Sequence, residues 1–136
     1  NRIAFVFPGQ GSQYQGMGKS LARNFKIAEK YFEKANKLLD FNLKNLIIDG
    51  PEEKLNNTRY TQPAIFTVSY VLNKILRNNE IKPEITAGHS LGEYSALGAV
   101  NSFSFEDGLK LVRKRGILMD EAVPEGQGAI AALIGM

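Results

Sequence analysis

The sequence predicts an α/β fold in which helices flank a parallel sheet. Two short runs, residues 3–7 and 84–87, have the composition of buried strands. The segments around them have helical periodicity, and one of them, residues 64–76, is apolar on nearly every side. Strands that alternate with helices pair in parallel through right-handed crossovers. We therefore expect the 64–76 helix to be central, packed on the sheet and covered by other elements.

Composition fits one ordinary globular domain and excludes several kinds of site. The chain has 136 residues, of which 43% are hydrophobic and 23% are charged. It has no cysteine and only one histidine, His89, which excludes disulfides, thiolate or multi-histidine metal sites and a cysteine nucleophile.

Charge and hydropathy indicate where the protein acts. No apolar run approaches the ~20 residues that span a bilayer, and no signal peptide is visible. The net charge of +3 is too small to indicate nucleic-acid binding, but it is compatible with an acidic partner or an anionic substrate. We expect a cytoplasmic protein that binds neither nucleic acid nor membrane.

The first half of the chain predicts a strand, a loop and two or three helices. Pro8-Gly9 ends the first strand and opens a Gly-rich loop that matches neither phosphate-binding pattern. The loop either allows a tight backbone approach or supplies N–H groups to a site. A helix is expected next, with Ile27, Tyr31, Ala35 and Leu38 on one apolar face. A short helix over 43–48 and a short turn or helix over 52–57 follow. Thr61 is the expected N-cap of the central helix, with Pro63 in its first turn.

The last helix, expected from Phe105 to about Val123, carries an arginine on its apolar side. A helical wheel places Arg115 between Leu111, Val112, Leu118 and Met119, while Lys110, Arg113 and Lys114 fall on a solvated face. A buried guanidinium is costly unless it is paired. Arg115 therefore needs a buried acid or an anionic ligand, unless it forms a structural ion pair or reaches solvent.

The second strand leads into G-H-S-L-G at residues 88–92, and a helical stretch follows. This is the pattern of a nucleophile elbow, in which a serine, here Ser90, stands at the tip of a very tight turn. Gly88 and Gly92 would supply the clearance that the turn needs. The N-terminus of the next helix would direct free N–H groups at a developing oxyanion. The alternative is a Gly-rich turn with an ordinary surface serine.

Together, these motifs closely resemble the malonyl-CoA:acyl carrier protein transacylase family and the acyltransferase domains of fatty-acid and polyketide synthases. The resemblance rests on F-P-G-Q-G-S-Q at 7–13, G-H-S-L-G-E-Y at 88–94 and the inward Arg115, with T-Q-P-A at 61–64 and E-A-V-P at 121–124. It implies an α/β-hydrolase-like large subdomain, incomplete here, over residues 1–126. Residues 127–136 would begin a ferredoxin-like small subdomain, with its first strand at 128–134.

The resemblance also implies a reaction and its residues. Ser90 would take a malonyl group from malonyl-CoA as an ester and pass it to the 4′-phosphopantetheine thiol of acyl carrier protein, in fatty-acid biosynthesis. The backbone N–H groups of Gln10 and Leu91 would form the oxyanion hole. Arg115 would bind the malonyl carboxylate, and Gln62 would line the pocket. No metal or bound cofactor is implied.

One departure from the family keeps two alternatives open. The family's base is a histidine far C-terminal to the elbow, whereas His89 precedes the serine and is expected to point away from its Oγ. The chain would then be an N-terminal part of the enzyme, or an inactive acyl-binding fragment. A serine esterase or thioesterase would share the elbow, although an arginine in the pocket argues against neutral acyl groups.

Overall fold

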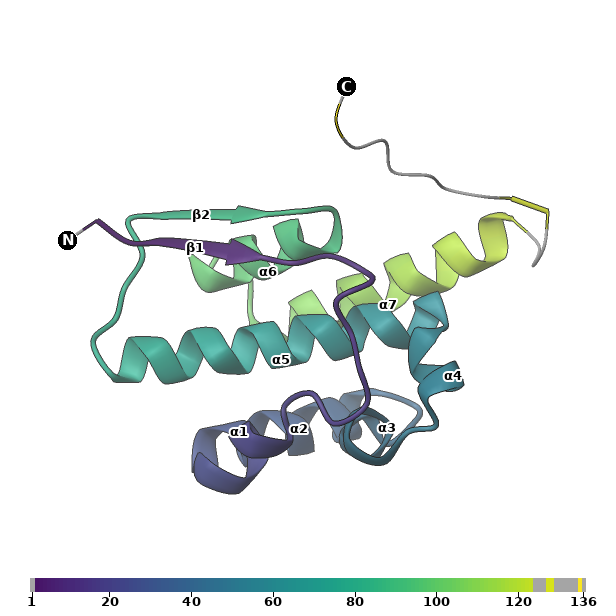
Figure 1. Cartoon of the computed structure of the whole chain (residues 1–136), viewed down its shortest axis with the longest axis horizontal. Coiled ribbons are helices and arrows are strands. Elements are labelled where there is room, and N and C mark those ends of the chain that lie inside the picture. The colour runs from purple at the N-terminus through teal and green to yellow at the C-terminus, as the bar shows by residue number, and fades with distance from the viewer. Residues whose placement is uncertain (1, 124–126, 129–134, 136) are drawn as a thin grey trace.

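The computed structural model describes residues 2–123, 127–128 and 135. Residues 129–134 of the strand expected at 128–134, and with them most of the predicted second subdomain, lie outside the described residues. In chain order the elements are β1 (Ala4–Phe7), α1 (Lys19–Asn24), α2 (Lys26–Leu38), α3 (Leu43–Asp49), α4 (Glu52–Asn56), α5 (Thr58–Asn78), β2 (Ile85–Gly88), α6 (Leu91–Ala99) and α7 (Phe105–Ala122) (Figure 1).

The elements are arranged around α5. β1 and β2 pair in parallel, with Ala4 opposite Ile85 and Phe7 opposite Gly88, which confirms the predicted pairing. In Figure 1 the two strands and α6 lie on one side of α5, and α1, α2 and α3 lie on the other. Helix α5 contacts α2, α4, α6 and α7, as expected of a central helix. None of the described helices is long and apolar enough to cross a membrane.

Aromatic side chains form the centre of the main core. Phe66 of α5 is fully buried and lies 5.9 Å from Tyr70, 6.5 Å from Phe103 and 6.0 Å from Phe105, measured between ring centroids. Burial raises the pKa of Tyr70 to about 12. At Gly108 of α7, a Cβ atom would lie 2.5 Å from Cζ of Phe66. The rings therefore fill the space between α5 and α7 to close packing.

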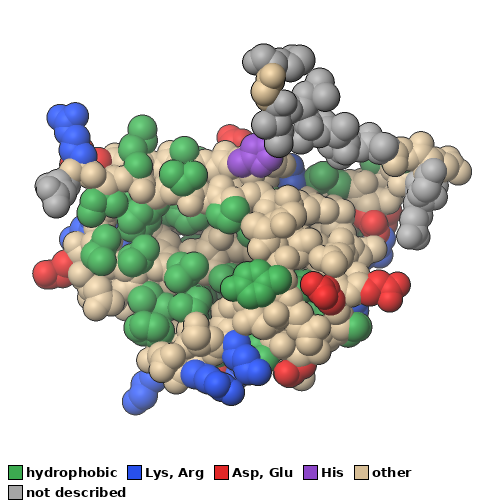
Figure 2. Space-filling view, viewed as in Figure 1, with side chains coloured by type: hydrophobic (Ala, Val, Ile, Leu, Met, Phe, Trp, Pro, Cys, Tyr) green, Lys and Arg blue, Asp and Glu red, His purple; other side chains and the backbone are tan. Residues whose placement is uncertain are grey.

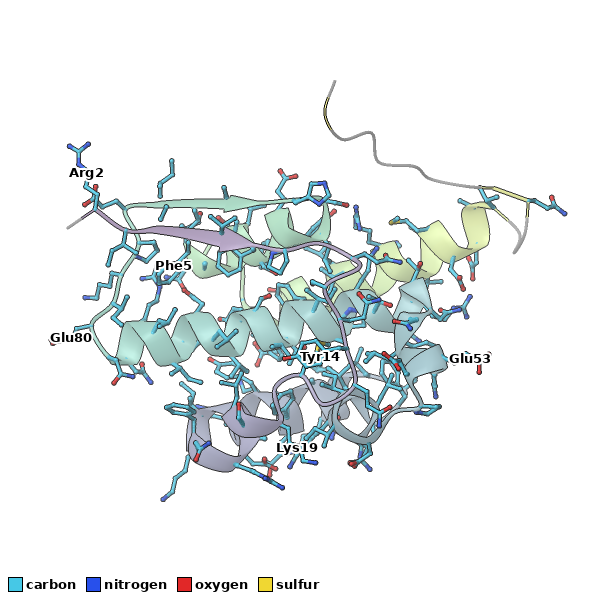
Figure 3. The ribbon with its side chains drawn as sticks, viewed as in Figure 1. Arg2, Phe5, Tyr14, Lys19, Glu53 and Glu80 are labelled. Atoms are coloured by element: carbon cyan, nitrogen blue, oxygen red, sulfur yellow. The ribbon has the colours of Figure 1, made fainter. Side chains whose placement is uncertain are left out.

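Helix α5 is separated from β1 by an open groove. The groove has a volume of about 520 Å³, and Phe5 and Tyr14, labelled in Figure 3, line it from the strand and from the loop that follows. Figure 2 shows apolar side chains gathered on this face of the molecule. Leu72 of α5 also lines the groove and is 42% exposed. The prediction that this helix packs directly on the sheet is therefore wrong at β1.

The start of α5 corrects the predicted cap. The helix begins at Thr58, and the Asn57 side chain accepts a hydrogen bond from the Arg59 N–H at 3.2 Å. Thr61 lies inside the helix and donates its hydroxyl to the carbonyl of Leu55 at 2.5 Å. Asn57 has extended backbone angles and an amide oxygen, so it caps the helix one turn before Thr61.

This earlier start places Pro63 inside the helix. Proline has no N–H, so the carbonyl of Arg59, four residues earlier, loses its helical donor. The Nη1 atom of Arg113 in α7 donates to that carbonyl at 2.8 Å. A side chain from another helix thus replaces the missing backbone hydrogen bond.

The helices α1 and α2 also differ from the prediction. Helix α1 has no counterpart among the predicted elements. The face of α2 that packs into the core is shifted by about one residue from the expected one, and its buried residues are Ala28, Phe32 and Ala35. Leu38, expected on the buried face, is 38% exposed.

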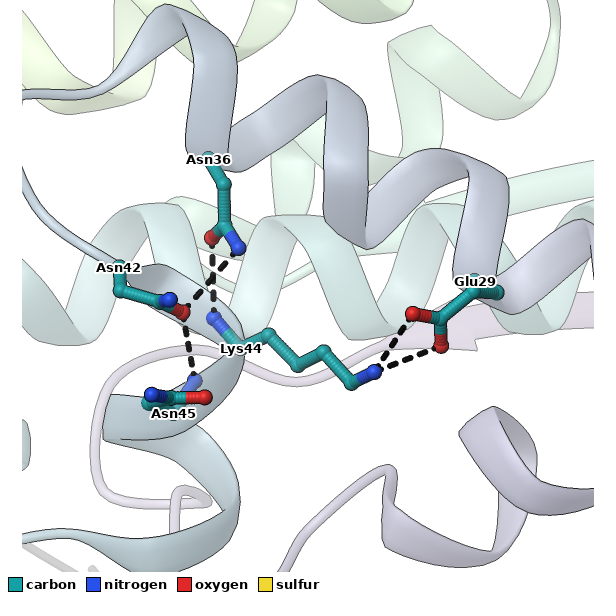
Figure 4. Close-up of polar contacts among 5 residues, drawn as sticks. All are labelled: Glu29, Asn36, Asn42, Lys44 and Asn45. Carbon is teal, nitrogen blue, oxygen red and sulfur yellow. Dashed lines mark hydrogen bonds and ion pairs between the residues drawn. The ribbon is translucent and has the colours of Figure 1, made fainter.

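The turn between α2 and α3 is held by a polar network (Figure 4). Asn42 caps α3 by accepting a hydrogen bond from the Asn45 N–H at 2.9 Å, and it accepts a second from Asn36 of α2 at 3.1 Å. Lys44 bonds to Asn36 through its N–H and to Glu29 through Nζ, at 2.6 Å. The network fixes how α3 leaves α2.

We predict that Phe66→Ala lowers the free energy of unfolding by about 3–5 kcal/mol, because it removes a fully buried ring from a close-packed cluster. Chemical denaturation measures the change. Leu72→Ala on the same helix is the control, and its exposed side chain should cost less than about 1 kcal/mol. Equal losses in the two variants would contradict this account of the core.

Candidate active site

Ser90 lies between the end of β2 and the start of α6. Its backbone angles are φ 53° and ψ −109°, a conformation that residues with a Cβ rarely adopt. Such strain is usually found where the surrounding structure forces it, often at functional sites. The side chain is exposed at the carboxyl edge of the sheet. The geometry is that of a strand, a sharp turn and a helix with the serine at its tip.

Two glycines allow this turn to close. A Cβ atom on Gly88 would lie 2.0 Å from the carbonyl carbon of Gly92, and one on Gly92 would lie 2.1 Å from the carbonyl oxygen of Phe7. Neither position can hold a side chain without moving the backbone. The first turn of α6 therefore lies directly against the ends of both strands.

The loop after β1 lies beside the elbow. The His89 N–H donates to the Phe7 carbonyl at 3.1 Å, and a Cβ on Gly9 would lie 2.6 Å from the His89 carbonyl oxygen. Gln10 is thus held close to the serine turn, and its Nε2 donates to Oγ1 of Thr58 at 2.9 Å. In the described part of the chain, the backbone N–H groups of Gln10 and Leu91 have no acceptor. Both remain available to an oxyanion.

Other side chains of this loop stabilise the loop itself. The Ser12 hydroxyl donates to the Gly9 carbonyl at 2.8 Å. The side chain of Gln13 accepts from the Gly11 N–H at 2.8 Å and donates to Asn56 of α4 at 2.9 Å. The Gly-rich loop therefore has a fixed shape that depends on its own polar residues.

Arg115 reaches the serine from α7. Its Nη2 atom donates to Oγ of Ser90 at 3.0 Å, and its guanidinium carbon lies 5.6 Å from the centroid of the Tyr94 ring. The structure thus joins two residues that are 25 positions apart in the sequence. A cation beside a serine hydroxyl can bind an anionic group of a molecule that reacts with that hydroxyl.

The surroundings of Arg115 correct one expectation. The sequence placed it in a buried apolar arc, but Leu111, Leu118 and Met119 are 47%, 54% and 39% exposed. Arg115 is itself half-buried. A helical wheel gives the direction of each side chain, and it does not show how much of the apolar arc other elements cover. In the described structure only part of it, at Val112 and Gly116, packs against α5 and the core.

Arg113 is more buried than the sequence predicted. It was expected on a solvated face, yet its side chain is only 14% exposed. It donates to the Arg59 carbonyl and to Asp40 at 2.9 Å, and its guanidinium lies 5.0 Å from the Phe41 ring centroid. A Cβ on Gly116 would lie 2.9 Å from the Thr58 carbonyl oxygen. These contacts fix α7 against the first turn of α5 and so set the position of Arg115.

Gln62, expected to line the pocket, is fully buried between α5 and α7. Its Nε2 donates to the sulfur of Met119 at 3.2 Å, and its Oε1 has no partner among the described residues. His89 is exposed, and no hydrogen bond joins it to Ser90 within the residues described here. Among the residues that the structure describes, no group of three or more potential metal ligands occurs.

Tyr94 is the site residue that the sequence analysis did not assign. It was quoted as part of the G-H-S-L-G-E-Y motif but was given no role. No sequence signal marked it, because Ser90 precedes α6 with non-helical backbone angles and helical spacing therefore does not relate the two side chains. The structure identifies Tyr94 through the guanidinium of Arg115, which lies 5.6 Å from its ring centroid.

We predict that Gly92→Ala destabilises the elbow, because the new methyl group would overlap the Phe7 carbonyl. The free energy of unfolding should fall by about 3 kcal/mol, and Ser90 should lose reactivity toward a fluorophosphonate probe. The matched control is Gly98→Ala on the same helix, where the nearest atom would be 3.4 Å away. That variant should be stabilised by about 0.5–1 kcal/mol with reactivity unchanged. Normal labelling of Gly92→Ala would refute the steric account.

Comparison with known proteins places this geometry in context. Residues 4–135 match the family described as Acyl transferase domain. The malonyl CoA-acyl carrier protein transacylase of Bacillus subtilis (strain 168) is 48% identical over 136 residues, which is 100% of this chain and 43% of that protein. The protein of the same name from Escherichia coli (strain K12) is 48% identical over 99% of this chain and 44% of its own length.

Solved structures agree in fold. The malonyl CoA-acyl carrier protein transacylase of Clostridium perfringens gives a TM-score of 0.87 at 44% identity, over 93% of this chain and 40% of that one. A malonyl-transacylase in complex with its type II polyketide synthase acyl-carrier protein gives 0.89 at 45% identity, over 93% and 41%. The chain thus spans less than half the length of these relatives. With the family match over nearly all of its residues, the chain belongs to the acyl transferase domain family.

Proposed function

We propose that this chain carries the nucleophile and the acid-binding arginine of a malonyl-CoA:acyl carrier protein transacylase. The observation that carries the proposal is the 3.0 Å contact between Nη2 of Arg115 and Oγ of Ser90. In a malonyl thioester the carboxylate is one methylene away from the carbonyl carbon that the serine attacks. A cation beside the nucleophile therefore suits a malonyl group better than an uncharged acyl group. The relatives named above carry this activity in their names.

The reaction proceeds in two transfers. Oγ of Ser90 attacks the thioester carbonyl, the carbon–sulfur bond breaks, and coenzyme A leaves as its thiol. The pantetheine thiol of acyl carrier protein then attacks the ester, and Ser90 regains its proton. Each tetrahedral intermediate places a negative charge on the carbonyl oxygen. The N–H groups of Gln10 and Leu91 would stabilise that charge, and losing one such donor typically lowers the rate about 10²–10³-fold.

One part of the reaction, removal of the Ser90 proton, needs a group beyond those described. The base that accepts the serine proton would be a histidine in a C-terminal segment, beyond the residues described here. Residues 1–126 would then form part of the large subdomain, and 127–136 would begin the small one.

Neither transfer requires a resident metal or cofactor, since both are acyl transfers between a hydroxyl and a thiol. Gln62 would contribute to the pocket indirectly, by holding the Met119 side chain that it contacts. We place the enzyme in the cytoplasm.

The rival activities differ in what they accept. A serine esterase or thioesterase would pass uncharged acyl groups to water, and the guanidinium beside Ser90 does not favour such substrates. An inactive acyl-binding fragment would form no ester at all. The next two experiments would detect either alternative.

The first experiment tests the covalent intermediate. The full-length protein is mixed with malonyl-CoA, and its intact mass is measured beside a Ser90→Ala control. We expect a gain of one malonyl group that the control lacks. The adduct should disappear when holo acyl carrier protein is added, because its thiol accepts the acyl group. Absence of an adduct in folded protein would leave Ser90 as an ordinary residue of a tight turn.

The second experiment tests the role of Arg115. We predict that Arg115→Ala reduces the ratio of kcat/KM for malonyl-CoA to that for acetyl-CoA by at least about tenfold, because a charge-assisted hydrogen bond to the carboxylate contributes about 1.5–3 kcal/mol. Arg115→Lys should keep the charge but lose the bidentate geometry, so its ratio should lie between that of the unmodified protein and that of Arg115→Ala. An unchanged ratio in Arg115→Ala would remove the proposed role.

A further inference from the structure

Arg115 is held in an unusual way. A guanidinium has five N–H donors, yet the described residues give this one a single hydrogen bond, to Ser90. Arg59 and Arg113 each pair with a carboxylate, Asp120 and Asp40 respectively. No ion pair among the described residues includes Arg115. Among the described residues, its orientation therefore depends on the Ser90 hydroxyl and on a contact that is not an ion pair.

The Tyr94 ring supplies that contact. The guanidinium carbon of Arg115 lies 5.6 Å from the ring centroid, within the range of a cation–π interaction. Tyr94 is on the first turn of α6, half-buried, and its ring packs against the main hydrophobic core. It is therefore held in place by packing that does not depend on Arg115.

The kind of contact determines what remains free. A carboxylate would take up two of the N–H donors of Arg115 and neutralise its charge. A ring binds the cation through its π face and takes up none of the hydrogen-bonding donors. The edge of the guanidinium stays available for a bidentate pair with the carboxylate of a substrate.

The two side chains also share one hollow. Tyr94 and Arg115 line a depression of about 390 Å³ on α6 and α7, together with Leu111, Lys114, Leu118, Met119 and Ala122. Apart from the two cations and the tyrosine, its lining is apolar. The depression thus places the ring and the guanidinium side by side on one open surface beside Ser90.

We propose that Tyr94 is a positioning residue that sets the selectivity for carboxylate-bearing acyl groups by orienting Arg115 beside Ser90. The inference rests on the proposed function. Tyr94 touches neither the serine oxygen nor the reacting carbonyl in this account. It acts through Arg115 alone, and its contribution should therefore appear only with substrates that carry a carboxylate.

The test compares Tyr94→Leu with Tyr94→Phe in the full-length protein. The readout is the ratio of kcat/KM for malonyl-CoA to that for acetyl-CoA, each measured by transfer to holo acyl carrier protein. Tyr94→Leu should lower the ratio about two- to five-fold, mainly through a higher KM for malonyl-CoA, since a cation–π contact has this magnitude. Tyr94→Phe keeps the ring face and should retain the ratio.

Several outcomes would overturn the inference. A purely structural role would slow both substrates equally and leave the ratio unchanged. A loss in Tyr94→Phe equal to that in Tyr94→Leu would assign the effect to the hydroxyl. If Tyr94→Leu does not fold, Tyr94→Met fills a similar volume without a ring, and its ratio decides in the same way.

A double variant separates this inference from the proposed function. In an Arg115→Ala background, Tyr94→Leu should have no further effect on the ratio, because the residue through which it acts is gone. An additional loss there would contradict the positioning role. If Arg115→Ala itself leaves the ratio unchanged, the proposed function fails. If Arg115→Ala lowers the ratio and Tyr94→Leu does not, only the role of Tyr94 fails.

Discussion

The close approach of α6 to the ends of the two strands is the constraint on which the site depends. A Cβ on Gly92 would lie 2.1 Å from the Phe7 carbonyl oxygen, so the first turn of α6 touches β1 backbone to backbone. The chain can reach this position from β2 only through a strained residue, and Ser90 takes that strain with φ 53°. The serine is exposed because the turn beneath it is too tight to bury it. Its backbone strain and its exposure have one cause.

A second constraint brings the other groups to the serine. The first turn of α5 binds the loop after β1 through Thr58, which accepts a hydrogen bond from Gln10. The same turn binds α7 through the Arg59 carbonyl, which Pro63 leaves without a helical donor and to which Arg113 donates. The loop after β1 and the helix that carries Arg115 are thus attached to two adjacent residues, Thr58 and Arg59. A change in this turn would move both sides of the site together.

The sequence predicted what depends on local pattern. Runs of apolar residues located the strands to within about one residue, and the spacing of Gly88, Ser90 and Gly92 located the elbow, because each is set by neighbouring residues. The start of α5 was wrong because Asn57 and Thr61 are both good caps, and only the tertiary position of Arg113 makes a proline inside the helix tolerable. Helical periodicity gives a direction for each side chain and carries no information on what lies there.

The two arginines of α7 show this limit most clearly and also show what the structure adds. They are two residues apart, and composition treats them alike. Arg113 has partners for both terminal nitrogens and a ring beneath it, so its binding capacity is used within the fold. Arg115 has one hydroxyl and one ring, which orient it and leave most of its donors without a partner among the described residues. Unused donors on an oriented cation are what an anionic substrate requires. The role proposed for Arg115 therefore rests on the 3.0 Å contact that places it beside Ser90 and on the donors that this contact leaves unused.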